Sequence, residues 1–179
     1  MVERTVAEYL ADAREIYGVF GQGKKALTAV DRALALEPEH VEALNLKAAI
    51  LYELDDDAQA MEYHRRALAV EPCSVEGWHG LAAIANDREE FAQALEFVEQ
   101  GITCIPRDPL PEFTENEDYR QRLIAELYNE KAFALWYSDR KPEAIELLTV
   151  TGPAACPMEV ETFEDQLDWL EQHPVSPEE

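Results

Sequence analysis

Apolar segments of helical periodicity recur along this chain, and each ends with a proline. The stretches ALALEPEH, ALAVEPCS and GITCIPRD contain the prolines Pro38, Pro72 and Pro106, whose numbers differ by 34 in both steps (72 − 38 and 106 − 72). A fixed period of this length predicts a repeat protein in which each unit stacks on the next. The prolines define three units, residues 7–40, 41–74 and 75–108.

Small residues recur within each unit where two helices must approach closely. Ala26, Ala60 and Ala94 share one place in the repeat. An α-helix completes two turns in about seven residues. A second place in the repeat, seven residues after the first, therefore falls on the same helix face. A side chain no larger than a methyl group there lets a facing helix come near. This second place holds Ala33, Ala67 and Gly101.

Turn-forming residues divide each unit into two helices. The stretches 21–23, 55–57 and 87–90 are rich in Gly, Asp and Glu, which suit turns and helix N-caps. The prolines end the second helices because proline cannot continue a helix. The predicted helices lie near 3–19, 23–36, 41–54, 57–70, 75–86 and 90–104.

The period is interrupted after the third unit. If Ala132 and Ala144 are small positions of a further unit, a degenerate fourth unit spans 125–158, with Thr151 at its second small place. This register leaves the stretch 109–124 as an insertion between the third and fourth units. We hypothesise that the insertion lengthens the next helix beyond the stack, toward a partner or a second copy of the chain.

Helices are also predicted in the C-terminal part of the chain. An apolar stripe predicts a long helix at 116–138, and a shorter one follows from Lys141 to about Val150. A further amphipathic segment at about 160–172 is predicted to cap the stack, because the last hairpin of a repeat array otherwise exposes an apolar face. The domain therefore spans 1–174, with a flexible tail at 175–179.

The strong negative charge narrows the choice of partners. The chain has 38 Asp and Glu against 15 Lys and Arg, a net charge of −23. This charge repels phosphate backbones and anionic lipids, so we expect neither nucleic-acid nor membrane binding. The opening stretch, MVERTVAEYL, contains charged side chains where a secretory signal needs an apolar stretch, so we expect a cytoplasmic protein.

The sequence gives little sign of catalysis or of metal binding. Cys73, Cys104 and Cys156 are widely separated, so reduced thiols are favoured over a disulfide framework or a zinc site. No two histidines have helical ligand spacing, and glycine-rich phosphate loops and nucleophile-elbow motifs are missing from the sequence. We therefore expect no enzyme activity, no cofactor and no metal.

The repeat resembles the tetratricopeptide repeat (TPR) family over residues 7–108, in its period, its small residues and its closing prolines. Arg14 departs from the family, which has a small residue at its place, and Lys47 stands where leucine is usual. The resemblance implies an all-α fold, a right-handed α-solenoid of about four antiparallel helix hairpins with a C-terminal capping helix.

The resemblance also implies that the first helix of each hairpin lines a concave groove that binds a peptide or helix of a partner. The groove is expected to be acidic and to favour a basic segment, because its places contain five glutamates and no cation. The places are Glu8, Ala11, Glu15 and Gly18; Glu42, Asn45, Ala49 and Tyr52; Glu76, His79, Ala83 and Asn86; and Glu126, Asn129, Phe133 and Trp136.

Two features of this set allow alternative readings. Asn45 and Asn129 hold the same place and could pair with a partner's backbone, or they could be polar residues on a solvated face. Phe133, Trp136 and Tyr137 could anchor a partner or belong to the core. In TPR co-chaperones, five places bind the C-terminal carboxylates of a chaperone. These places are occupied here by Ala11, Glu15, Leu46, Glu76 and Gly80, which excludes a co-chaperone function.

These observations predict a protein-binding adaptor or scaffold. Two alternatives remain at this point. One is a chaperone of a hydrophobic client, similar to type III secretion chaperones in size, repeats and acidity. The other is a self-assembling structural scaffold, including a homodimer formed through residues 109–138.

Overall fold

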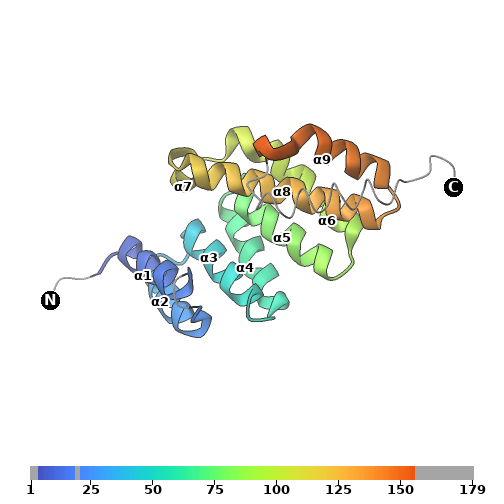
Figure 1. The fold of residues 1–179 in the computed structure, drawn as a ribbon. Coiled ribbons are helices and arrows are strands. Elements are labelled where there is room, and N and C mark those ends of the chain that lie inside the picture. Colours follow the sequence, from blue (N-terminus) through green and yellow to red (C-terminus); the bar gives the residue numbers. More distant parts are fainter. Residues whose placement is uncertain (1–3, 19–20, 156–179) are drawn as a thin grey trace.

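The computed structural model describes residues 4–18 and 21–155, and the regular elements in this part of the chain are all helical (Figure 1). The predicted capping helix at about 160–172 and the tail at 175–179 lie outside the described residues. The helices are α1 (Val6–Gly18), α2 (Gly23–Leu36), α3 (Val41–Tyr52), α4 (Asp57–Val70), α5 (Val75–Asp87), α6 (Phe91–Cys104), α7 (Pro111–Glu115), α8 (Glu117–Tyr137) and α9 (Lys141–Ala155), with a 3₁₀ turn η1 (Ile105–Arg107) between α6 and α7.

Helices α1 to α6 match the six helices predicted for the three units, and α8 matches the long helix predicted at 116–138. The prediction for α9 was wrong at its end, because this helix continues to Ala155 and does not stop near Val150. Thr151, Gly152 and Pro153 favour a helix end, but α9 packs along α8, and tertiary packing outweighs local propensity.

Neighbouring helices pair as antiparallel hairpins, α1 with α2, α3 with α4, α5 with α6, and α8 with α9 (Figure 1). The small residues lie at the contacts, since Ala26, Ala60 and Ala94 are all fully buried. Gly101 is required for a close approach: a Cβ atom there would lie 2.9 Å from Leu127 Cδ2 of α8. The fourth hairpin therefore packs directly on the third hairpin at this glycine.

The turns inside the hairpins share one backbone conformation. Gly21, Asp55, Glu89 and Asp139 all have left-handed backbone angles, with φ of 59°, 60°, 60° and 58°. The first three follow one another at exactly one repeat (55 − 21 and 89 − 55 both give 34), and the fourth comes later by one repeat plus the length of the insertion. The same turn therefore reverses the chain in every hairpin.

The insertion folds against the third hairpin. Phe113 of α7 and Leu123 of α8 are each 3% exposed and share one apolar cluster with Val75, Cys104 and Leu127. The apolar side of the insertion is thus part of the core. The exposed residues of the insertion, most of them polar, remain for other contacts.

Candidate functional site

The first helices of the hairpins form one continuous face, here called the inner face. Helix α3 packs against α5, and α5 packs against α8. Polar side chains cross between these helices: the Tyr52 hydroxyl of α3 donates a hydrogen bond to Asp87 of α5. The Asn86 amide of α5 donates to the Glu130 carboxylate of α8 at 2.7 Å.

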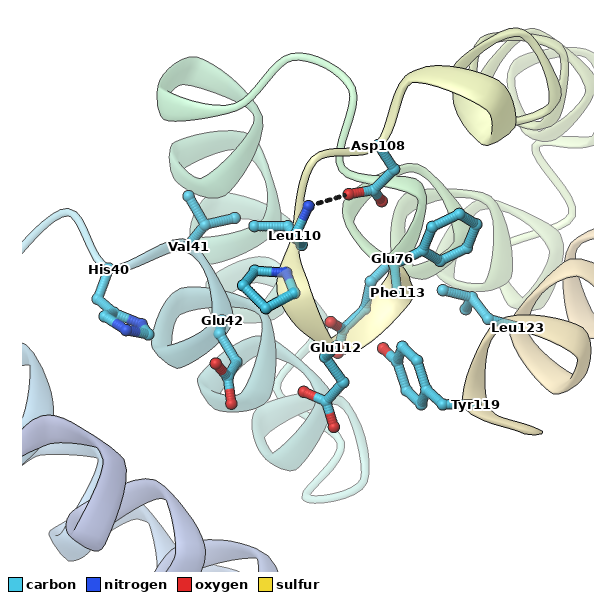
Figure 2. A pocket seen from close by; sticks show the side chains of 11 residues that line it. His40, Val41, Glu42, Glu76, Asp108, Leu110, Glu112, Phe113, Tyr119 and Leu123 are labelled. Carbon is cyan, nitrogen blue, oxygen red and sulfur yellow. Dashed lines mark hydrogen bonds between the residues drawn. The ribbon is translucent and has the colours of Figure 1, made fainter. Parts of the chain in front are cut away.

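A pocket lies at the N-terminal part of the inner face, where the insertion meets it (Figure 2). We call Arg14, Glu42, Glu76, Glu112 and Tyr119 the acidic pocket. Arg14 of α1 forms ion pairs with Glu42 of α3 and with Glu112 of α7. Tyr119 of α8 and Glu76 of α5 both line the pocket, and the two side chains interact electrostatically. Residues of α3, α5, α7 and α8 line a volume of about 200 Å³, and Arg14 of α1 reaches two of its carboxylates.

The acidic pocket carries more negative than positive charge. Burial raises the pKa of Glu76 to about 7, and repulsion from Glu112 and Glu42 adds to this effect. Burial also raises the pKa of Glu112, although Arg14 opposes that rise. Three carboxyl groups face one guanidinium, so an excess of one or two negative charges remains, depending on the protonation of Glu76.

Farther along the inner face, polar groups are held close together but are not fully paired. His79 and Glu130 lie 3.9 Å apart, and burial lowers the pKa of His79 to about 4, so its ring is neutral at pH 7. Burial raises the pKa of Glu130. The Oδ1 atom of Asn86 is buried without a hydrogen-bond partner. This part of the face therefore has capacity to accept a hydrogen bond.

The predicted groove residues fall into three groups by exposure. The exposed ones are concentrated on α1, and two asparagines are buried. The exposed residues are Glu8, Ala11, Glu15, Gly18 and Phe133; the partly buried residues are Glu42, Ala49, Tyr52, Glu76, His79, Ala83, Glu126, Asn129 and Trp136; and the buried residues are Asn45 and Asn86.

Asn45 lies inside the fold and takes no part in the exposed surface of the inner face. Its amide donates to Ser74 Oγ at 2.9 Å, and its Oδ1 atom lies 3.1 Å from His64 Nδ1. His64 therefore donates through Nδ1, and burial lowers the pKa of its ring to about 3. Ser74 in turn caps α5 by accepting from the Gly77 backbone. At this repeat place the side chain therefore faces the neighbouring segments of the fold, and Ser74 and His64 satisfy its amide.

An aromatic patch lies at the far end of the inner face. Phe133 and Tyr137 of α8 are 45% and 57% exposed, and their ring centroids are 4.6 Å apart. Phe91 of α6 stacks on Tyr137 with a centroid distance of 5.5 Å. Trp136 is partly buried, and Lys141 lies over its ring. The two exposed rings belong to the surface, whereas Trp136 packs partly within the fold.

Several residues of this face were not among the predicted groove places. Arg14 was noted only as a departure from the family pattern, and its charge in a small-residue place was a signal of a special contact. Glu112 and Tyr119 lie in the insertion, where no period gives their position. Asp87 and Glu130 each directly follow a predicted groove place, and the period alone does not show that they also reach this face.

Two kinds of site are not found in the part of the chain that the structure describes. Residues 4–18 and 21–155 contain no group of three or more His, Cys, Asp or Glu side chains that could hold a metal ion. Among the helices described here, none is both long and apolar enough to cross a membrane.

No family model and no curated protein sequence matches this chain. Among solved structures, it is similar to TTC0263, a thermophilic TPR protein of Thermus thermophilus, with a TM-score of 0.70 and 19% identity over 94% of this chain and 82% of that one. It is also similar to two structures of MamA, each with a TM-score of 0.61. The first is 14% identical over 96% of this chain and 78% of the MamA chain. The second is 16% identical over 92% of this chain and 81% of the MamA chain. The chain therefore has a TPR-like solenoid fold.

Proposed function

We propose that this protein is an adaptor that binds a basic segment of a partner protein along its inner face. The observation that supports the proposal is the unbalanced charge of the acidic pocket, where the three carboxyl groups of Glu42, Glu76 and Glu112 face the guanidinium of Arg14. A lysine or arginine side chain of a partner would offset this excess charge. The net charge of −23 would steer such a segment toward the protein.

The inner face offers further contacts along the same direction. Glu8 and Glu15 are exposed on α1, and the partly buried Glu126 lies on α8. Asn86 Oδ1 is an unpaired buried acceptor that a donor from the partner could reach after a small side-chain movement. An extended segment lying across α1, α3, α5 and α8 would meet acidic groups first and the aromatic patch last.

The test is a binding titration with two short fluorescent peptides, one of alternating lysine and alanine and one with glutamate in place of lysine. We expect the lysine peptide alone to bind, with an affinity that falls as salt is added. The double variant Glu42→Gln/Glu112→Gln should bind it about tenfold more weakly, because two favourable charge contacts are lost.

The matched control is Glu62→Gln/Glu96→Gln, which removes the same charge from exposed places on the second helices α4 and α6. This control should bind the lysine peptide as the wild type does. An equal loss of affinity in both double variants would show that only net charge attracts the peptide, and the proposed site on the inner face would then be wrong.

A second candidate function rests on the aromatic patch. Phe133 and Tyr137, with the partly buried Phe91 beside them, form an apolar surface that suits a hydrophobic client, as expected of a secretion-type chaperone. Such a client would remain soluble with the wild-type protein and aggregate with a Phe133→Ser/Tyr137→Ser variant. Light scattering at increasing protein concentration would detect the remaining alternative, self-association through residues 109–138.

A further inference from the structure

Two cysteines that are far apart in the sequence meet beside the third hairpin. Cys73 lies in the loop before α5, and Cys104 is the last residue of α6, 31 residues later. Their Sγ atoms are 2.7 Å apart, closer than two sulfur atoms that merely touch. Both are free thiols. A disulfide has an S–S distance of about 2.05 Å, so only a small approach separates this pair from a covalent bond.

The surrounding contacts hold both cysteines in place. The Cys73 backbone N–H donates to the Glu71 carboxylate at 3.0 Å. The Pro72 carbonyl, directly before Cys73, accepts from the Trp78 indole at 2.9 Å and from the Cys104 thiol at 3.6 Å. The pair is therefore brought together by an ordered loop and the end of a helix, and the fold has already met the conformational cost of closing the ring.

We propose that Cys73 and Cys104 form a reversible disulfide that links the loop before the third hairpin to the end of its second helix. The oxidant is a small-molecule disulfide of the glutathione type. Cys73 is partly exposed, whereas Cys104 is 5% exposed, so the oxidant reaches Cys73 first. Burial raises the pKa of the Cys104 thiol to about 12, which also makes Cys104 the later nucleophile.

The exchange proceeds in two balanced steps. The Cys73 thiolate attacks one sulfur of oxidised glutathione, forms a mixed disulfide and releases one glutathione thiolate. Cys104 then loses its proton to solvent, attacks Cys73 Sγ and releases the second glutathione thiolate. Two protein thiols are oxidised to one disulfide, and one oxidised glutathione is reduced to two thiols, which take up the protons.

The disulfide would act on the segment that leads to the acidic pocket. Cys104 directly precedes η1, and its carbonyl accepts the Asp108 N–H at 2.9 Å. The Asp108 carboxylate in turn accepts from the Val75 N–H at 2.7 Å. Cys104 also packs with Phe113 and Leu123, which line the pocket. The oxidised chain should therefore hold the insertion more firmly against the third hairpin.

The first experiment maps the bond in a Cys156→Ser chain equilibrated with oxidised and reduced glutathione. Trypsin cleaves after Arg66, Arg88 and Arg107, so Cys73 and Cys104 fall on separate peptides, 67–88 and 89–107. We expect mass spectrometry of the unreduced digest to find these peptides joined. Recovery of the two peptides apart, as free thiols or as glutathione adducts, would overturn the proposal.

The second experiment asks whether the fold itself favours the bond. We expect the folded chain to keep the disulfide at glutathione ratios at which the urea-unfolded chain has lost it. The oxidised chain should also unfold at a higher urea concentration, and reduction should reverse this shift. A Cys73→Ser/Cys156→Ser chain should show no shift. If the bond formed equally well in folded and unfolded chains, the arrangement of the pair would have no role.

Discussion

Arg14 in the first hairpin and Glu112 in the insertion form an ion pair, although 98 residues separate them in the sequence. Repeat stacks are held mainly by contacts between neighbouring units. Here the insertion adds a contact between the first hairpin and a segment that follows the third. The same contact completes the acidic pocket, so the stability of the stack and the proposed binding site depend on shared residues.

The first prediction concerns Arg14→Gln. Removing the guanidinium leaves Glu42, Glu76 and Glu112 facing one another, and we expect a loss of about 1 kcal/mol of unfolding free energy near neutral pH. The loss should shrink in acid, because protonation relieves the repulsion among the carboxylates. Urea unfolding at two pH values measures both effects, with the exposed Arg32→Gln in α2 as the charge-matched control. Equal losses in both variants would contradict the role assigned to Arg14.

The second prediction concerns the pH dependence contributed by Glu76. Its pKa is about 7 in the folded chain, above the ordinary value of 4.5, so between these values the folded chain holds a proton that the unfolded chain has lost. The stability from this proton is fully present below pH 4.5 and is lost as the pH rises through 7. Glu76→Gln keeps the neutral form at every pH.

We therefore expect Glu76→Gln to exceed the wild type in stability by about 1–2 kcal/mol above neutral pH and to match it in acid. His64 and His79 titrate in the opposite sense, but they do so in both proteins and cancel in the comparison. Chemical denaturation across this pH range provides the test. The exposed Glu62→Gln is the charge-matched control. A difference between Glu76→Gln and the wild type that does not change with pH would refute the assignment.

The third prediction concerns Gly80→Ala. A Cβ atom at Gly80 would lie 2.0 Å from His64 Nε2, and His64 cannot move away without breaking its contact with Asn45. We expect a loss of about 2–3 kcal/mol. Gly18→Ala is the control, because a Cβ atom there meets nothing within 4 Å.

A double-mutant cycle identifies the cause of this loss. In a His64→Ala background the space beside Gly80 is open, so Gly80→Ala should cost much less there than in the wild type. Thermal unfolding of the four proteins would give the coupling. An unchanged cost in both backgrounds would mean that the substitution acts on helix α5 alone.

The fourth prediction is a stabilising substitution in a hairpin turn. Glu89 has a φ of 60°, a left-handed conformation that an L side chain adopts with strain. Glu89→Gly should raise the free energy of unfolding by about 0.5–1 kcal/mol. The control, Glu96→Gly in the middle of α6, should lower it by about as much, and calorimetry on both variants would show whether the two shifts have opposite signs.

The period of the sequence was sufficient to predict most of the fold, because small residues and prolines act through local geometry. Ala26, Ala60 and Ala94 are buried at the helix contacts, and the helix ends of the three units lie close to the predicted bounds. The path of the insertion could not be predicted in this way. Phe113 and Glu112 are positioned by contacts with segments far away in the chain, and no periodic pattern encodes those contacts.

The candidate site was predictable only in its general location. Glu42 and Glu76 occupy groove places and do face the acidic pocket, but Arg14, the ion-pair partner of Glu42, was noted only as a departure from the family pattern. Asn45 was predicted at the surface from its place in the repeat. Its amide is instead buried because Ser74 and His64 supply an acceptor and a donor from neighbouring segments, which a one-dimensional pattern does not reveal.

The ion pair between the first hairpin and α7 also has a consequence for the order of folding during synthesis. The first hairpin leaves the ribosome long before residue 112, so Arg14 has no Glu112 to pair with until the third hairpin has been made. Hairpins that appear early can pair with their neighbours at once, but the acidic pocket is assembled only after the third hairpin has been made. Nascent chains that stop short of the insertion would therefore present a folded stack without the completed pocket, and they could bind a partner there only after the insertion has been made.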